Sequence, residues 1–468
     1  MTADQPLSLH DIITRAAPMA QDAGVSRVLP ELEALRQSVP DAHMPPARAF
    51  DTLTAAALSA HPPRVPRSTD LTVFDPGMVS CGGHHVQFNR FLIDALTARG
   101  TSFSILSGNS ACTAQFGLSD HFHDVFTLNP YEFDHLVTDL TDALAMNLLF
   151  VLELATARLH PPRVWLCHSL RITNCLAVMA LARQHHAPLV GVVVEFDHLA
   201  PDHEHARVAD DVYRVMFDLT RDRSDAVQLT CETDNGQSYM NAIAAERHTD
   251  VRLGCAHYLP AIWNARQYRQ PAPRAPAPCF GFVGGTRESR GADILPLAIV
   301  ESCARHPEIT WRVQFDRTYL TGQMPTDVVQ AWDGLIFSGR LTVLGQGLDS
   351  ADYYAHLNAL DILVLPYAER YKHSGSGVFH EALSFAKPVL VMAGSTMAHD
   401  LDRLGIAGPR IATYSADDVV DAITETLSDT AALGHMQRQF ADGADRFNTD
   451  LDAFLDAFGP TTTTQAAQ

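Results

Sequence analysis

The sequence predicts an α/β protein with two doubly wound domains, each built on a parallel sheet, that face a cleft. Strand-like apolar runs alternate with helix-like segments from Leu71 ("LTVFDPG") and again from Cys279 ("CFGFVGG"). Such βαβ alternation is typical of parallel sheets with helices on both faces. Between the two series, residues 269–279 ("RQPAPRAPAPC") alternate proline with small residues, which suits a semi-rigid linker and excludes helix or sheet.

The order of elements divides the chain into five segments. The first domain begins with a strand at Leu71, a helix in "HHVQFNRFLIDALTARG" and a strand in "TSFSILSG", and the second repeats this rhythm as far as "PVLVMAG". We expect both domains to be Rossmann-like. The expected segments are a helical N-terminal appendage (1–67), a first α/β domain (68–265), a linker (266–278), a second α/β domain (279–440), and a last helix with a tail (441–468).

Composition limits the class of protein. The formal net charge of -20 disfavours binding of nucleic acid or of an anionic membrane through a general basic surface. The N-terminus lacks the layout of a signal peptide, and no run of 18 apolar residues occurs, so we expect a cytoplasmic protein without a transmembrane segment. Peripheral membrane contact stays open. The eight cysteines are scattered without a CxxC pair, which indicates reduced core residues.

A glycine- and serine-rich loop is the first candidate binding site. The stretch "HSGSG" holds Ser374, Gly375, Ser376 and Gly377, after the strand-like "LDILVLPY" and before the helix-like "GVFHEALSFA". Backbone N–H groups at a helix start favour an anion, and glycines let a ligand approach. The loop has neither GxxxxGK[ST] nor GxGxxG. It therefore predicts a phosphate site, with a turn capped by serine as the alternative.

Three charged residues could complete this site. Arg287 and Arg290 follow the first strand of the same domain, where their guanidinium groups could neutralise a diphosphate. Glu381 lies one helical turn above the phosphate loop, where its carboxylate could accept two ribose hydroxyls. The alternatives are an ordinary solvated loop for the arginines and a favourable helix-dipole contact for the glutamate.

At this point the sequence resembles the glycosyltransferases of the GT-B fold, in particular the retaining family 4. The segments "FVGGTRESRG", "LDILVLPY" and "GVFHEALSFAKPVLV" match, in order, the family patterns "FVGRLxxxKG", "aDvxVLPS" and "GxxxxEAxAxGxPVV". The resemblance makes Glu381 the ribose-binding second glutamate of the E-x7-E motif and puts Arg290 in the place of the family's lysine. It also places Gly284 at the nucleotide sugar, and it implies that the first domain (68–265) binds the acceptor and the second (279–440) the nucleotide sugar.

The same resemblance implies the chemistry. It predicts a hexosyltransferase-type enzyme that uses a UDP- or GDP-linked sugar as co-substrate, no separate cofactor, and a hydroxyl acceptor such as a glycan or a lipid-linked sugar. Arg287 and Arg290 would stabilise the leaving diphosphate. Two positions depart from the pattern, because His373 replaces the first glutamate and Gly285 replaces an arginine. We expect Arg287 to compensate for that missing arginine.

The first domain offers a second group of candidates. Gly82 and Gly83 lie between its first strand and first helix, similar to the family's loop beneath the donor diphosphate, and His84 and His85 follow. Members of the family often contact the sugar through a histidine or acidic residue after a later strand. The sequence leaves several choices for that contact, namely His168, Glu195, Asp197 and His198. We assign a catalytic role to Asp197 in this domain and to His373 in the second domain.

Two alternatives remain open. The stretch "DHLAPDHEHAR" (197–207) is rich in metal-ligand types, but it lacks HExxH, so we predict no metal and favour a polar lid or acceptor loop. The departures at His373 and Gly285 keep open a catalytically silent donor-binding protein. A sugar-nucleotide epimerase or a sugar phosphorylase is a further alternative within the same fold.

Overall fold

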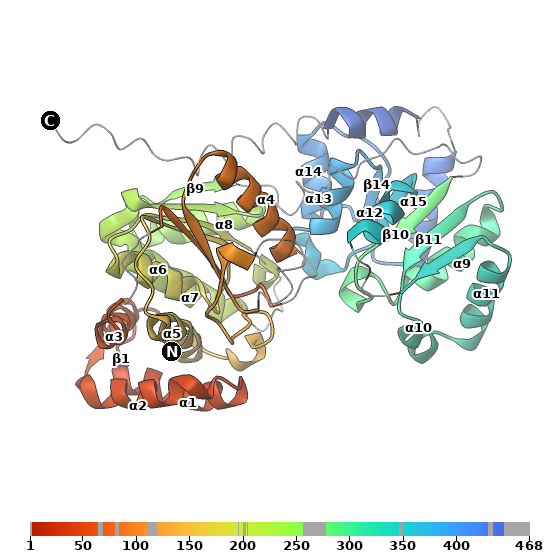
Figure 1. Cartoon of the computed structure of the whole chain (residues 1–468). Helices are drawn as coiled ribbons and strands as arrows, with labels where there is room; N and C mark the ends of the chain where they lie inside the picture. The colour runs from red at the N-terminus through yellow and green to blue at the C-terminus, as the bar shows by residue number, and fades with distance from the viewer. Residues whose placement is uncertain are drawn as a thin grey trace. The chain divides into compact units, whose positions relative to one another are not determined.

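The chain forms two compact units, Met1–His257 and Tyr258–Gln468 (Figure 1). The computed structural model describes residues 2–63, 69–79, 84–109, 119–194, 196–199, 203, 205–255, 278–345, 348, 350–428 and 434–443. Each unit contains one parallel sheet, so the predicted pair of doubly wound α/β domains is confirmed. Apart from Pro278, the predicted linker lies outside the described residues, as does the helix expected at 450–458.

The described part of the N-terminal unit contains a seven-stranded sheet of order β5-β4-β3-β6-β7-β8-β9, in which every neighbouring pair is parallel. Its strands are β3 (Leu71–Asp75), β4 (Phe103–Ser107), β5 (Phe122–Asp124), β6 (Val164–Leu170), β7 (Leu189–Val193), β8 (Val227–Cys231) and β9 (Arg252–Cys255). Its helices after β3 are α4 (His84–Ala98), α5 (Leu140–Ala157), α6 (Cys175–Gln184), α7 (Ala206–Thr220) and α8 (Asp234–Glu246). The winding reverses between β3 and β6, so the carboxyl ends of these strands are the usual ligand position of this sheet.

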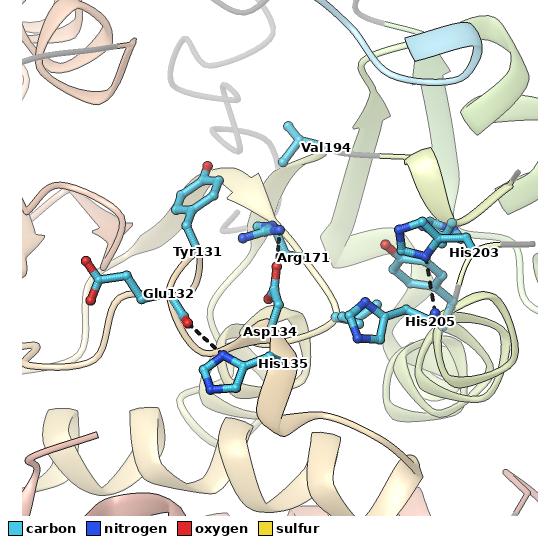
Figure 2. Close-up of a pocket in the computed structure, with 11 residues that line it drawn as sticks. Tyr131, Glu132, Asp134, His135, Arg171, Val194, His203 and His205 are labelled. Atoms are coloured by element: carbon cyan, nitrogen blue, oxygen red, sulfur yellow. Dashed lines mark hydrogen bonds and ion pairs between the residues drawn. The ribbon is translucent and has the colours of Figure 1, made fainter. Parts of the chain in front are cut away.

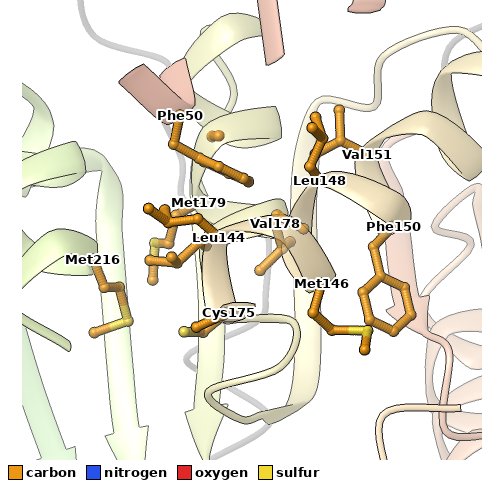
Figure 3. Close-up of a cluster of buried hydrophobic side chains, with 14 of the residues drawn as sticks. Phe50, Leu144, Met146, Leu148, Phe150, Val151, Cys175, Val178, Met179 and Met216 are labelled. Atoms are coloured by element: carbon orange, nitrogen blue, oxygen red, sulfur yellow. The ribbon is translucent and has the colours of Figure 1, made fainter. Parts of the chain in front are cut away.

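The N-terminal segment packs against helices of this unit. It contains α1 (Leu9–Asp22), α2 (Leu29–Ser38) and α3 (Pro46–Ala60), with an antiparallel pair of β1 (Leu7–Ser8) and β2 (His43–Met44). Helices α1 and α3 contact α5, and α3 also contacts α6 and α7. Figure 3 shows Phe50 of α3 among buried side chains of α5, α6 and α7, including Leu144, Met179 and Met216. The segment that we predicted as a helical appendage thus shares the core of the N-terminal unit.

Helix α5 lies at the centre of that core. Among the described residues it is the one helix of sufficient length and apolarity to cross a membrane, and 89% of it is buried inside the protein. It begins after Asp139, whose carboxylate accepts a hydrogen bond from the N–H of Asp142. Because neighbouring helices cover it on several sides, its nearly uniform apolarity is explained by packing.

The described part of the C-terminal unit contains a five-stranded parallel sheet of order β12-β11-β10-β13-β14. Its strands are β10 (Cys279–Phe282), β11 (Thr310–Gln314), β12 (Leu341–Leu344), β13 (Ile362–Leu365) and β14 (Val389–Val391). Its helices include α9 (Leu295–Arg305), α10 (Arg317–Gln323), α11 (Thr326–Phe337), α12 (Ser350–Asn358), α13 (Gly377–Ser384), α14 (Thr396–Arg403) and α15 (Ala416–Leu427), and residues 434–443 are also helical. Here the winding reverses between β10 and β13, which brings the loops after these two strands to the usual ligand position.

Short 3-10 helices lie in several loops. The described ones in the N-terminal unit are η1 (Ser26–Val28), η3 (Ser119–His121), η4 (Asp134–Leu136), η5 (Phe196–Leu199) and η6 (Arg221–Ala226). In the C-terminal unit, η9 (Glu288–Arg290) follows β10 and η10 (Glu369–Lys372) follows β13. Both of these stand in the two loops at the switch point, so the backbone of the candidate site is largely structured.

Candidate functional site

The "HSGSG" loop connects η10 to the amino end of α13. Ser376 is the N-cap of α13, and its hydroxyl accepts a hydrogen bond from the N–H of Phe379 at 3.2 Å. The carbonyl of Ser374, a buried residue, accepts a hydrogen bond of 2.8 Å from the Thr396 hydroxyl at the start of α14. The serine cap that we considered from the sequence is therefore present. Helix α13 nevertheless keeps its amino end at the carboxyl edge of the sheet, where an anion is favoured.

The loop after β10 brings Arg290 to this helix. Gly284 has a φ of +107°, and a Cβ at this position would lie 3.0 Å from Nη1 of Arg290 and 3.5 Å from Val378 of α13. The N–H of Gly284 donates a 2.9 Å hydrogen bond to Oε1 of Gln314. Both the backbone conformation and the close approach of the guanidinium group require glycine here. Gly284 thus holds open the space in which Arg290 lies near the amino end of α13.

Two tyrosines hold the Arg290 side chain, which is partly buried. Its Nε donates a hydrogen bond to the hydroxyl of Tyr371 at 3.3 Å, and its Cζ lies 6.0 Å from the centre of the Tyr367 ring. Arg287 differs, because it is exposed as the N-cap residue of η9. The structure therefore preorganises the charge of Arg290 and leaves that of Arg287 at the surface. His373, the residue after η10, is partly buried.

Glu381 of α13 faces helix α12. Its carboxylate accepts hydrogen bonds from the hydroxyls of Tyr353, at 2.5 Å, and Tyr354, at 3.3 Å. Burial raises the pKa of Glu381 to about 7, although both hydrogen bonds act to lower it. Sequence reasoning missed these tyrosines. The adjacent pair in "ADYYAHLN" gave no signal by itself, because its partner lies 27 and 28 residues away.

A buried cluster of polar side chains lies at the switch point of the N-terminal unit. Asp75, the last residue of β3, is 1% exposed. Its Oδ1 lies 2.6 Å from Nδ1 of His85, and its Oδ2 accepts a 2.6 Å hydrogen bond from Nδ2 of Asn89. Nε2 of His168, in β6, lies 3.1 Å from the same Oδ2. Two predicted residues, His85 and His168, are thus brought together by an aspartate that sequence reasoning missed.

The electrostatics of this cluster keep Asp75 ionised. Burial disfavours its charge, but the imidazoles of His85 and His168 hold the pKa of Asp75 well below its ordinary value. Burial lowers the pKa of His168, so this imidazole is neutral. The three side chains have the composition of a metal site, with ligand atoms within 4.8 Å of one another. Asp75 is hydrogen-bonded to His85 and Asn89, whereas the buried Nε2 of His168 lies near Oδ2 without a hydrogen-bond partner in the described part of the chain, so hydrogen bonding accounts for part of the cluster.

His85 extends this cluster to the loop after β5. Its Nε2 lies 3.1 Å from the hydroxyl of Tyr131. A Cβ on Gly77 would lie 2.4 Å from Cε1 of His85 and 2.8 Å from Cε2 of Tyr131. Only glycine at position 77 therefore leaves the space for this pair. The bond joins residues 46 positions apart, which explains why sequence patterns did not indicate Tyr131.

Tyr131 also lines a pocket of about 320 Å³ in the N-terminal unit (Figure 2). The guanidinium Cζ of Arg171 lies 4.2 Å from the centre of the Tyr131 ring, and Arg171 forms an ion pair with Asp134. Residues that follow β6 and β7 line the pocket, so it lies at the carboxyl edge of the sheet. The lining comprises Tyr131, Glu132, Asp134, His135, Arg171, Ile172, Val194, His198, His203, His205 and Tyr213.

Several solved structures are similar to this chain in fold. A glycosyltransferase from Rickettsia africae has a TM-score of 0.54 at 10% identity, over 84% of this chain and 100% of that chain. HepE from Anabaena, in complex with UDP, has a TM-score of 0.53 at 15% identity, over 83% of this chain and 100% of that chain. UDP-GlcNAc 2-epimerase from Neisseria meningitidis, bound to UDP-GlcNAc, has a TM-score of 0.50 at 14% identity, over 82% and 99%.

The chain has the GT-B fold. At these identities the likeness establishes the fold and leaves the activity open. No protein-family model matches the chain, and no curated protein matches it in sequence. Assignment of a role to any residue of this GT-B protein therefore depends on the geometry of its own side chains.

For most of the remaining predicted site residues, the structure does not describe the side chain. His84 begins α4 and Asp197 lies in η5, but the described structure does not extend to either side chain. Gly82, Gly83 and Glu195 lie outside the described residues. His198, which is 5% exposed, lines the pocket. Part of the stretch "DHLAPDHEHAR" therefore borders a cavity large enough for a small ligand.

Proposed function

We propose that this GT-B protein is a glycosyltransferase that moves a sugar from a UDP- or GDP-linked donor to a hydroxyl acceptor. The placement of Arg290 carries the proposal, because this cation is held beside Gly284, near the amino end of α13 and at the switch point of the C-terminal sheet. A guanidinium group and a helix amino end together favour a diphosphate. That similar structures contain UDP or UDP-GlcNAc supports a nucleotide-sugar ligand.

The proposed reaction proceeds with retention of configuration, as the family 4 resemblance implies. The bond between the anomeric carbon and the donor diphosphate breaks, and its electron pair passes to the diphosphate. The acceptor oxygen bonds to the anomeric carbon on the same face, and its proton passes to a donor phosphate oxygen. Arg290 would stabilise the leaving diphosphate by a charge that is already in place, so the step requires no nucleophile from the protein.

Glu381 would bind the ribose of the donor in this proposal. Its carboxylate already accepts hydrogen bonds from two phenol hydroxyls, Tyr353 and Tyr354. Ribose offers two hydroxyl donors of the same kind, and an ionised carboxylate can accept several hydrogen bonds at once. When the donor binds, Tyr353 and Tyr354 on α12 would either keep their hydrogen bonds to Glu381 or be replaced by the ribose hydroxyls.

A sugar-nucleotide epimerase is the second candidate. The observation that favours it is the buried group of acid–base side chains in the N-terminal unit, with Asp75, His85 and Tyr131 in hydrogen-bond contact. Epimerisation at carbon requires proton removal and return, for which such groups are suited. A similar structure is itself a UDP-GlcNAc 2-epimerase. Glycosyl transfer releases a nucleotide diphosphate only when an acceptor is present. Epimerisation would instead convert the donor into an isomeric sugar nucleotide.

A screen of donors followed by product analysis tests these proposals. UDP, GDP, ADP and their sugars are compared by thermal shift, since a ligand that binds the native state raises Tm by mass action. The donor that binds is then incubated with candidate glycan acceptors, and nucleotide diphosphate, sugar 1-phosphate and isomerised donor are quantified by chromatography. A separate incubation of glycan with inorganic phosphate and no nucleotide tests the remaining alternative, because sugar 1-phosphate formed there would indicate a phosphorylase. Binding without any product would contradict the enzyme proposal and support a silent donor-binding protein.

A further inference from the structure

Two buried polar atoms at the switch point of the N-terminal unit have no hydrogen-bond partner among the described residues. They are Nε2 of His168, in β6, and Oδ1 of Asn89, on α4. Both residues are at most 1% exposed, so bulk solvent does not cover these atoms. Buried polar atoms in proteins are nearly always satisfied, and an exception calls for an explanation such as a bound ion.

Both atoms belong to side chains that surround the carboxylate of Asp75. Nδ2 of Asn89 donates a 2.6 Å hydrogen bond to Oδ2 of Asp75. Nε2 of His168 lies 3.1 Å from the same oxygen, but in an orientation that forms no hydrogen bond with it. Nδ1 of His85 lies 2.6 Å from the other oxygen. Hydrogen bonding therefore explains the positions of Asn89 and His85 but not that of His168.

Asp75, His85 and His168 together offer the donor atoms of a metal site. Their ligand atoms all lie within 4.8 Å of one another. In a tetrahedral zinc site, with bonds of about 2 Å, neighbouring donor atoms are about 3.3 Å apart. The distances of 2.6 Å and 3.1 Å from the imidazole nitrogens to Asp75, together with the 4.8 Å limit, bracket this value. The three donors are therefore already close to the spacing that such an ion requires.

Both imidazoles form a hydrogen bond through the nitrogen that a metal would not use. Nδ1 of His168 lies 3.1 Å from the hydroxyl of Ser169, and Nε2 of His85 lies 3.1 Å from the hydroxyl of Tyr131. A hydroxyl can accept as well as donate, so each imidazole can carry its proton on this nitrogen and bind a metal through the other. Outer hydrogen bonds of this kind orient the ligands of metal sites.

Three neighbouring elements supply the ligands. Strand β3, which ends at Asp75, pairs with β6, which carries His168. Helix α4 carries His85 and, four residues later on the same face, Asn89. An ion bound to these ligands would link two strands and a helix at the switch point of the sheet, and its removal should destabilise the N-terminal unit.

We propose that Asp75, His85 and His168 bind one zinc ion that stabilises the N-terminal unit. Two imidazoles and a carboxylate suit zinc, whereas Mg²⁺ and Ca²⁺ prefer oxygen ligands. A water molecule would complete the tetrahedral set, and it can donate a hydrogen bond to Oδ1 of Asn89. The sequence analysis considered a metal only at residues 197–207, and none of these three ligands belongs to that stretch. The site is independent of the proposed glycosyltransferase reaction.

Metal titration of the full-length protein, without an affinity tag, tests the proposal. The protein is dialysed against a chelator and then titrated by calorimetry with ZnCl₂, and in a parallel experiment with MgCl₂. Because the chain has 23 histidines, the stoichiometry of tight binding is the informative quantity. We expect one tightly bound equivalent of Zn²⁺ and no comparable binding of Mg²⁺. Addition of Zn²⁺ should also raise Tm, since a ligand that binds the native state stabilises it.

Three variants separate this site from other histidines. His168→Gln removes the ligand whose Nε2 is unpartnered and should abolish the tightly bound equivalent. His356→Gln is the matched control, because His356, on α12 of the other unit, is equally buried and its Nε2 also has no hydrogen-bond partner within the described ranges. If His168→Gln does not fold, Ser169→Ala decides the question. It removes the outer partner of His168 and should weaken Zn²⁺ binding about ten- to a hundredfold.

The possible results either support or overturn the zinc site. Tight binding that is lost in His168→Gln, weakened in Ser169→Ala and unchanged in His356→Gln would support it. Absence of tight Zn²⁺ binding in the wild type, unchanged affinity in Ser169→Ala, or an equal loss in His356→Gln would each overturn it and leave a hydrogen-bonded cluster without a metal. None of these measurements uses a nucleotide or a sugar, so their outcome is separate from that of the donor screen.

Discussion

Glu381 on α13 accepts a hydrogen bond from the Tyr353 hydroxyl on α12, which links the helix of the candidate donor site to its neighbour. A carboxylate in this position experiences two opposed effects. Burial favours its protonated form and the phenol donor favours its charged form, and burial prevails, since the pKa rises to about 7. The charge of the candidate ribose-binding residue is therefore sensitive to pH near neutrality.

Stability should fall as pH rises through the range set by Glu381. Its pKa is raised from 4.5 in the unfolded chain to about 7 in the folded protein, so the folded state binds the proton more tightly between these values. This difference should lower the free energy of unfolding by up to about 3 kcal/mol from acidic to neutral pH. Glu381→Gln should remove that part of the pH dependence. Urea denaturation across this range measures it, and equal slopes for wild type and variant would contradict the assignment.

Replacement of the two candidate arginines should have unequal effects. Arg290 is held by Tyr371 and lies beside Gly284, whereas Arg287 is exposed. Arg290→Ala should lower kcat roughly a hundredfold, because a preorganised charge acts on the leaving diphosphate, and Arg290→Lys should retain part of the activity. Steady-state kinetics with the donor found by thermal shift gives the comparison.

The result for Arg287→Ala tests the compensation that we predicted from Gly285. A loss comparable to that of Arg290→Ala would support compensation by Arg287, although this arginine is exposed. Near-normal turnover would reject compensation and leave the proposed enzyme function in place. If both variants keep normal activity and normal donor affinity, the diphosphate binds elsewhere.

Gly284→Ala should disturb the donor site without disrupting the fold. The residue has a φ of +107°, and the added Cβ would lie 3.0 Å from the Arg290 guanidinium, so backbone strain and displacement of Arg290 are both expected. We expect at least about tenfold weaker binding of the nucleotide sugar, measured by calorimetry, on the scale of one charged hydrogen bond. Gly334→Ala, within α11 and with open space around its Cβ, is the control and should leave affinity unchanged.

The sequence predicted those features that depend on local patterns. Parallel strands buried on both faces give apolar runs, so both sheets and the position of the "HSGSG" loop before α13 could be read from alternation. The approach of Arg290 to α13 followed from the carboxyl ends of β10 and β13 lying side by side. The order of residues along the chain could not show that Tyr371 would form a hydrogen bond with Arg290 and not with Arg287.

The features that were missed depend on contacts between distant segments. Asp75 looked like part of a buried strand, and its role became visible only when β6 placed His168 beside it. Tyr131 stands in a loop whose partners, His85 and Arg171, lie 46 residues before it and 40 residues after it. Likewise, the sequence indicated N-terminal helices but not that α1 and α3 would pack on α5.

Gly77→Ala provides a test of packing around the pair of His85 and Tyr131. The added Cβ would lie 2.4 Å from Cε1 and 2.6 Å from Nε2 of His85, and 2.8 Å from Cε2 of Tyr131, so the two rings must move apart. We expect a loss of about 1–3 kcal/mol in the free energy of unfolding, as for an overpacked core. Gly322→Ala, where a Cβ meets open space in α10, is the control for urea denaturation.

A double-mutant cycle identifies the source of this loss. If the Cβ acts by colliding with the imidazole, Gly77→Ala should cost much less stability in a His85→Ala background, where the ring is absent. The coupling should then reach about 0.5–3 kcal/mol, as for residues in direct contact. Additive losses would mean that the alanine acts through the backbone of the turn after β3. In that case the space left by Gly77 would not be what positions His85 against Tyr131.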